Sequence, residues 1–198
     1  MIFAKKFYAT ARLILTAGAL LAGAADAEAA SARPMDTERS MLTVKVYKTG
    51  LFSGFAHDHV IQAPIAQGWF DEQNPAVELT VETRQLKVVD PEGSDKDRAE
   101  VQRTMLGPKV MDRQSFPEIR FRSTQVEAKA DNQWTVRGDL TLHGQTRPVT
   151  VNVEYRKGRY WGSAALKQRD FGIVPVSVAG GTVKVKDEVR VEFEVVGR

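Results

Sequence analysis

Residues 138–151 read GDLTLHGQTRPVTV and join two alternating segments through a short polar turn. The leucines of the first segment alternate with polar neighbours, which is the period-2 pattern of a half-buried strand. Gly144 supplies the turn, and Pro148 restarts the chain at a strand position that tolerates a missing backbone N–H. The valines after Pro148 share one face. The stretch therefore predicts a β-hairpin with His143 at its turn.

The same alternation of apolar and polar residues recurs along most of the chain, with turn residues between the alternating segments. Such a series predicts antiparallel strands that form either a sandwich or a closed barrel. The predicted strands lie at residues 42–47, 77–82, 119–123, 134–138, 149–153, 160–166, 183–185 and 189–195.

Residues 94–111 break this pattern, because their apolar side chains recur at helical spacing. Ser94 is suited to cap the helix N-terminus, and the Gly107-Pro108 pair ends it. We therefore expect a short helix in the mid-chain connection, packed as a cap on an opening between strands.

The N-terminal segment has the features of a secretory signal peptide. Three basic residues precede an apolar run at residues 13–22, and A-x-A sites follow within residues 25–29. The run is shorter than the ~20 residues that span a bilayer, so cleavage is favoured over an uncleaved anchor. The predicted organisation is a signal peptide at residues 1–29, a polar leader at 30–40 and one domain at 41–198, with no transmembrane segment in the mature chain.

Charge and cysteine content exclude several classes of protein. The formal net charge is only +3, and Lys and Arg mostly alternate with Glu and Asp instead of forming the basic patch that nucleic-acid binding requires. The chain has no Cys, which excludes disulfides and lipidation at a lipobox cysteine. Stability must therefore come from burial of apolar side chains.

Three segments resemble motifs of the YceI-like family: VMDRQSFPEIRFRST at residues 110–124, VRGDLTLHGQTRPVTV at 136–151 and RDFGI at 169–173. The resemblance covers about residues 42–196. It implies an all-β fold, an eight-stranded antiparallel lipocalin-like barrel with a short helical cap in the mid-chain connection. It also implies export in bacteria and, as in some members of the family, a polyisoprenoid chain held inside the barrel.

Such a ligand would contact the inward-facing apolar side chains, because eight strands leave an interior that fits either side chains or one slender ligand. The alternative is a solid core, which uses the same alternation, so only the resemblance favours a lined cavity. The candidate ligand-binding residues are Val44, Val46, Leu79, Val81, Phe121, Val136, Val151 and Phe193.

The segment GFAHDHVI at residues 54–61 departs from the commoner family pattern and suggests a metal site as an alternative. His57 and His59 would point the same way in an extended segment, and two imidazoles can begin a site for a divalent metal such as Zn or Cu. His143 or a carboxylate would have to supply a third ligand. The competing interpretation is a loop in which Asp58 caps a turn and the histidines pack at the barrel mouth.

The sequence offers little for catalysis. Asp139 and His143 could form an acid–base pair with Ser123 or Thr146 as nucleophile, but no nucleophile elbow accompanies them. We therefore expect a periplasmic binding protein for a hydrophobic or amphipathic lipid, not an enzyme, with a metal-binding protein or metal-dependent hydrolase as the alternative. An open barrel leaves edge strands for pairing, so a homodimer is compatible with the sequence.

Three basic residues near the predicted helix are candidates to face a lipid phosphate. A solvated helix face is the alternative, and composition favours it. The three residues are Arg98, Lys109 and Arg113.

Overall fold

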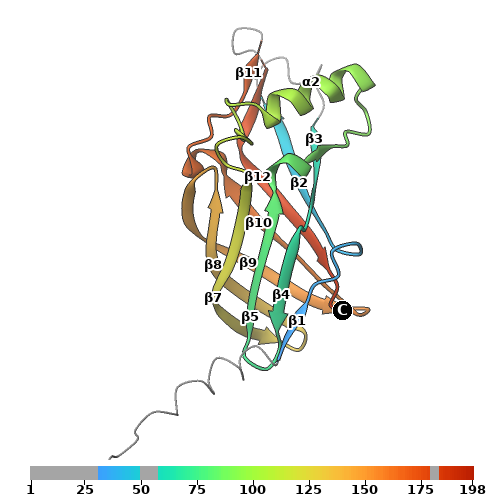
Figure 1. Cartoon of the computed structure of the whole chain (residues 1–198), viewed down its shortest axis with the longest axis vertical. Coiled ribbons are helices and arrows are strands. Elements are labelled where there is room, and N and C mark those ends of the chain that lie inside the picture. The colour runs from blue at the N-terminus through green and yellow to red at the C-terminus, as the bar shows by residue number, and fades with distance from the viewer. Residues whose placement is uncertain (1–30, 50–57, 179–182) are drawn as a thin grey trace, which may run out of the picture. The chain divides into compact units, whose positions relative to one another are not determined.

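The computed structural model describes residues 31–49, 58–178 and 183–198 (Figure 1). The predicted signal peptide and His57 lie outside these residues. The elements run in the order β1 (Ala32–Pro34), β2 (Met41–Thr49), β3 (His59–Pro64), β4 (Gln67–Asp71), β5 (Ala76–Glu82), η2 (Thr83–Gln85), β6 (Lys87–Val88), α2 (Asp95–Leu106), β7 (Glu118–Ala130), β8 (Gln133–Leu142), β9 (Gln145–Arg156), β10 (Arg159–Lys167), η3 (Gln168–Phe171), β11 (Ser177–Val178) and β12 (Val183–Val195).

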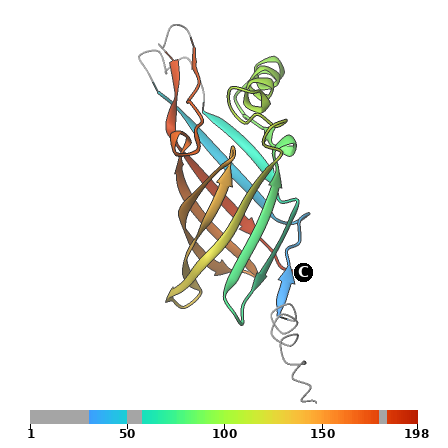
Figure 2. The ribbon, with the colours of Figure 1, turned by 60° about the vertical axis from the view of Figure 1, so that its left-hand side comes forward.

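The strands form one antiparallel sheet that curls around an interior (Figures 1 and 2). Its order is β1-β4-β5-β7-β8-β9-β10-β12-β2-β3-β6, and β11 pairs with β12. Helix α2 lies over one end of the curled sheet (Figure 2). The predicted all-β barrel with a helical cap is therefore confirmed. The path ends at β1 and β6, and pairing of either strand with a second copy stays a prediction.

The number of strands differs from the expected eight: the described residues form a sheet of twelve. The segments at 183–185 and 189–195 belong to one strand, β12, whose register with β2 shifts between Val185 and Val189. Strands β3 and β4 were not predicted, since HVIQAP and QGWFD lack a clean alternation and contain Pro or Gly. Three further strands, β1, β6 and β11, have only two or three residues each.

The predicted hairpin is present as β8 and β9, which pair from Gln133↔Glu154 to Leu142↔Gln145. His143 and Gly144 form its two-residue turn, and both have positive φ angles, 50° and 71°. This is the turn geometry that matches the twist of the flanking strands. A Cβ at Gly144 would also lie 2.5 Å from a ring carbon of Phe116, so glycine is required there.

The domain begins earlier than the expected position near Met41. Strand β1 pairs with β4, and the Met35 side chain that follows it is only 2% exposed. The Ser40 hydroxyl accepts a hydrogen bond from the backbone N–H of Val196 at 2.9 Å. Residues 31–40 are therefore part of the barrel, although their composition is polar.

Helix α2 begins and ends as predicted. The Ser94 hydroxyl accepts a hydrogen bond from the backbone N–H of Asp97, and Gly107 follows the last turn. The Gln102 amide joins the helix to the sheet, because it accepts from the Val88 N–H and donates to the Leu86 carbonyl, both at 2.7 Å. Among the described residues, no helix has the length and apolar character to span a bilayer.

Gly162 of β10 allows the ring of Phe193 on β12 to lie against the backbone. A Cβ at Gly162 would overlap the Asn152 carbonyl oxygen and the Phe193 ring. We expect Gly162→Ala to lower the free energy of unfolding by about 1–3 kcal/mol, the usual cost of overpacking. Urea denaturation would measure the change. Ser163→Ala, at the next position, is the control, and equal losses in the two variants would contradict the prediction.

Candidate functional site

The barrel encloses a cavity of about 830 Å³. It extends along the barrel, since residues near both ends of β8, Trp134 and Leu142, line it. Its wall is almost entirely aliphatic and aromatic, because the period-2 alternation of each strand directs one apolar face inward. The interior is therefore hollow, and the solid core considered as an alternative is not what the sheet encloses.

The eight residues proposed from the sequence as ligand contacts all line this cavity. They come from six strands that surround the interior, and on each of these strands the apolar face recognised from the alternation is the face that lines the cavity. That these side chains contact a ligand stays a prediction. The eight are Val44 and Val46 of β2, Leu79 and Val81 of β5, Phe121 of β7, Val136 of β8, Val151 of β9 and Phe193 of β12, while β10 contributes Ala164.

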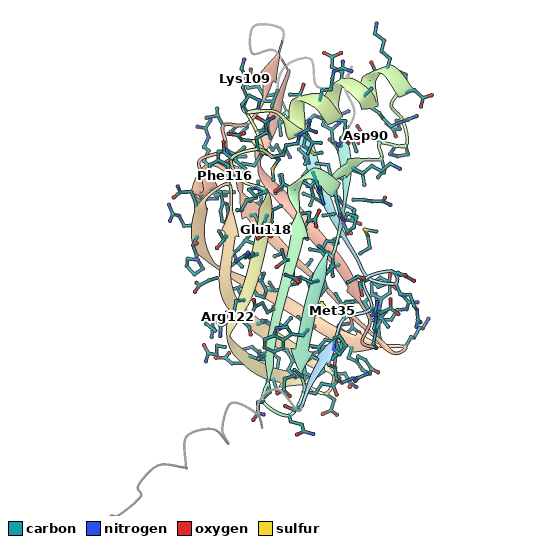
Figure 3. All side chains as sticks on the ribbon, in the orientation of Figure 1. Met35, Asp90, Lys109, Phe116, Glu118 and Arg122 are labelled. Atoms are coloured by element: carbon teal, nitrogen blue, oxygen red, sulfur yellow. The ribbon has the colours of Figure 1, made fainter. Side chains whose placement is uncertain are left out.

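An aromatic cluster lies at the end of the cavity remote from α2. The rings of Phe70 and Tyr160 meet edge to face at 5.2 Å, and the Trp134 ring lies 6.0 Å from that of Tyr160. The Tyr160 hydroxyl donates to the Glu72 carboxylate at 2.7 Å. Burial and this hydrogen bond raise the pKa of the Tyr160 phenol, so the hydroxyl stays a donor. Met35, labelled in Figure 3, lies at this end, and it belongs to the same apolar cluster as Phe70.

Helix α2 supplies the opposite end of the cavity. Met105 is buried in an apolar cluster with Val81 of β5 and Leu86. The helix also brings polar groups to the lining, namely Asp97, Glu100 and Thr104. These residues were not identified from the sequence, because a polar helix face usually faces solvent and only the tertiary structure places this one at the mouth of a cavity.

His59 lines the cavity and contacts a buried carboxylate, that of Asp90. Figure 3 labels Asp90 near the α2 end. The His59 Nδ1 lies 2.6 Å from Asp90 Oδ2, while Asp90 Oδ1 accepts the backbone N–H of Val60 at 2.7 Å. The Asp90 side chain is completely buried. This contact fixes the orientation of the His59 ring at the cavity wall.

The metal hypothesis gains no support within the described residues. They contain no group of three or more His, Cys, Asp or Glu side chains arranged to hold a metal ion, and His57 lies outside them. His143 packs its ring 4.4 Å from that of Phe116 and shares a 3.2 Å hydrogen bond with the Phe171 carbonyl. These contacts indicate a structural role for His143 in the hairpin turn. The Asp58 carboxylate accepts the backbone N–H of Lys48 at 2.9 Å.

The side chains considered for catalysis take part in strand and turn contacts. The Ser123 hydroxyl accepts the backbone N–H of Val77 at 2.9 Å. The Thr146 hydroxyl lies 2.8 Å from that of Thr141 on the neighbouring strand. These partners do not connect Ser123 or Thr146 to His143.

The three basic residues near the helix do not line the cavity. Arg98 donates to the Asp90 carbonyl at 3.0 Å and pairs with Asp95, so its guanidinium is held at the start of the helix. Lys109 and Arg113 are exposed. The solvated-face interpretation therefore fits Lys109 and Arg113, and Arg98 has a structural role.

Comparison with known proteins finds several similar proteins that share the name UPF0312. A UPF0312 protein of Photorhabdus laumondii is 30% identical over 184 residues, covering 79% of this chain and 83% of the relative. A UPF0312 protein of Vibrio cholerae is 32% identical over 127 residues, which cover 59% of this chain and only 61% of the length of that relative.

Among solved structures, BcnA of Burkholderia cenocepacia superposes with a TM-score of 0.58 at 17% identity, covering 81% of this chain and 98% of BcnA. A mutant Campylobacter jejuni YceI protein gives a TM-score of 0.50 at 15% identity, covering 77% and 85%. At these identities the likeness concerns the fold alone.

The sequence model of the YceI-like domain matches residues 34–197. This match runs from the first strand of the barrel to the penultimate residue of the chain. The chain therefore belongs to the YceI-like family.

Proposed function

We propose that this protein is a periplasmic carrier that holds one long-chain lipid, an isoprenoid or a similar amphipathic molecule, inside its barrel. The observation that supports this most directly is the 830 Å³ cavity with its almost wholly apolar wall. An apolar cavity of this size inside a folded barrel is the usual form of a small-molecule site. The basic and apolar segments before residue 25 support export.

The proportions of the cavity suit a single chain. Strand β9 has 12 residues, which at ~3.3 Å per residue and a tilt of ~40° correspond to a barrel length of about 30 Å. A cylinder of that length enclosing the cavity volume is roughly 6 Å wide, and carbon contacts of ~3.5–4.0 Å fit one hydrocarbon chain in it. The interior therefore favours a slender ligand over a bulky polycyclic one.

Burial of the ligand's hydrocarbon chain is sufficient for binding. Each buried methylene contributes about 0.8 kcal/mol, so about twenty of them contribute about 16 kcal/mol. The loss of translational and rotational freedom costs roughly 4–15 kcal/mol. A ligand of this length can therefore bind without an ion pair to the protein.

A carrier or sequestering role explains the described side chains better than catalysis does. The hydroxyls of Ser123 and Thr146 and the imidazole of His143 are engaged in the contacts of the sheet and of the hairpin turn. The cavity wall offers hydrocarbon contacts along its length, with polar groups at its two ends.

Solvent extraction tests the proposal. We expect protein purified from the periplasm of its own host to release a long-chain lipid near one molecule per chain, identified by mass spectrometry. A cavity of fixed volume predicts a narrow range of chain lengths. A periplasmic protein of similar size, purified in parallel, controls for lipid carried over from the membrane. Recovery of no lipid above that control would overturn the carrier function.

A further inference from the structure

We propose that the polar end of the ligand carries no negative charge and donates hydrogen bonds, as a primary alcohol or amine does, and that this end lies at the α2 end of the cavity. This inference rests on the proposed function and adds the chemical class of the headgroup. A fatty acid with the same chain should be rejected.

The charged side chains that line the cavity are carboxylates. Asp97 and Glu100 lie at the α2 end, and Asp71 and Glu72 at the opposite end. No Lys or Arg among the described residues lines the cavity. The internal segments outside the description, residues 50–57 and 179–182, contain neither residue type in their sequence. Within the described residues, therefore, no Lys or Arg side chain at the cavity can pair with an anionic headgroup.

His59 does not change this balance. Its Nδ1 lies 2.6 Å from the carboxylate of Asp90, which is completely buried. The imidazole at the lining is therefore already in contact with an acidic side chain of the protein itself.

The nearest basic residues already have partners of their own. At the α2 end, Arg98 pairs with Asp95 and donates to two backbone carbonyls. At the opposite end, Arg33 pairs with Glu72 at 3.2 Å and stacks over the Phe70 ring. Neither arginine lines the cavity.

Two observations favour the α2 end for the headgroup. At the opposite end the carboxylate oxygens are already engaged, since Asp71 accepts from the backbone N–H groups of Gln73 and Asn74 and Glu72 accepts from Tyr160. The hydrogen bond from the Ser31 hydroxyl, together with those from Asn74 and Gln73, lowers the pKa of Asp71. At the α2 end, Glu100 makes no hydrogen bond or ion pair among the described residues, and it can accept one from the ligand.

Electrostatics then selects the headgroup. Asp97 and Glu100 are exposed, so a headgroup beside them keeps part of its hydration, and the two carboxylates repel an anionic headgroup. An alcohol donates a hydrogen bond to the same acceptors at little cost, and an ammonium group gains Coulomb attraction. The hydrocarbon chain contributes the same affinity in all three molecules, so the difference in affinity between them comes from the headgroup.

The test uses three ligands with one chain: hexadecanol, hexadecylamine and hexadecanoic acid, each below its micelle concentration at neutral pH. Each ligand competes with the neutral fluorescent probe N-phenylnaphthylamine for purified protein that has been freed of extractable lipid. We expect the acid to bind at least about tenfold more weakly than the alcohol, and the amine to bind at least as tightly as the alcohol. Equal or tighter binding of the acid would overturn the inference.

Two charge variants test whether the headgroup preference arises at the α2 end of the cavity. Glu100→Lys places a cation at the lining and is expected to strengthen binding of the acid by at least about tenfold. Glu92→Lys makes the same change of net charge at an exposed position that does not line the cavity, and it should leave the preference unchanged. An equal gain in both variants would overturn the assignment to the α2 end. If neither the probe nor any of the three ligands binds, the carrier function itself fails, which is a separate result.

Discussion

Replacing Ala164 by Phe is expected to abolish binding of a long-chain lipid while leaving the barrel folded. Ala164 lies on β10 and its side chain lines the cavity. A phenyl ring there would displace at least about three methylenes from a channel one chain wide, a loss of about 2.4 kcal/mol or roughly fiftyfold in affinity. The ring would also block the channel beyond Ala164, so the loss of affinity is expected to exceed this fiftyfold figure. Lipid recovered by extraction and probe binding would both measure the effect.

The neighbouring residue provides a matched control. Ala165 is exposed and lies on the outer face of the same strand. Ala165→Phe adds the same side chain to the same strand and should retain the lipid content of the wild type. Thermal unfolding of both variants establishes that each one is folded. Undiminished lipid binding by the Ala164 variant would show that the ligand does not occupy this part of the interior.

Replacing Asp90 by Ala is expected to cause the largest loss of stability. The change removes the acceptor for the Val60 N–H and for His59 Nδ1, and it leaves both donors near a buried position. Breaking a buried pair by removing one partner typically costs about 3–5 kcal/mol. That is a large part of the roughly 5–15 kcal/mol by which domains are stable. Urea denaturation, read by tryptophan fluorescence, would measure it.

Two further variants separate the contributions to this effect. Asp90→Asn keeps an acceptor for the Val60 N–H and is expected to lose only about 1–2 kcal/mol. His59→Phe leaves the backbone bond intact and removes the imidazole, so a double-mutant cycle with Asp90→Ala gives the coupling between the two side chains. If Asp90→Ala were as stable as the wild type, the buried carboxylate would have no structural role.

The sequence predicted the cavity wall well, for a simple reason. In a strand, successive side chains point to opposite faces, so Val44 and Val46 had to share a face, as did Leu79 and Val81. The same rule located the β8–β9 hairpin, whose turn requires residues that adopt positive φ. The helix was predicted from a local signal too, because the Ser94 cap lies next to the turn it stabilises.

Elements without a local signal were missed. Strand β1 has three residues in a polar segment, and its place is set by pairing with β4, some forty residues later in the chain. Met35 is buried because that pairing brings it over Phe70. A short segment of this kind carries too few residues for any periodicity to be read.

The polar contacts of the site could not be predicted from the sequence either. His59 was identified as a metal ligand candidate, yet its partner within the described residues is Asp90, 31 positions away. Glu100 resembled any solvated helix residue until the packing of α2 placed it at the cavity. These contacts depend on how elements meet in space, and spacing along the chain does not encode that.

The amino-acid sequence by itself determined the all-β class, the apolar face of each strand it recognised and the capping helix, because these depend on alternation, turn geometry and capping within a few residues. The tertiary structure alone decided that the interior is hollow. Whether facing side chains meet or leave a channel depends on the radius at which the sheet curls. That radius is set by the pairing of distant strands, such as β12 with β2, and not by the apolar character that a filled and a hollow barrel share.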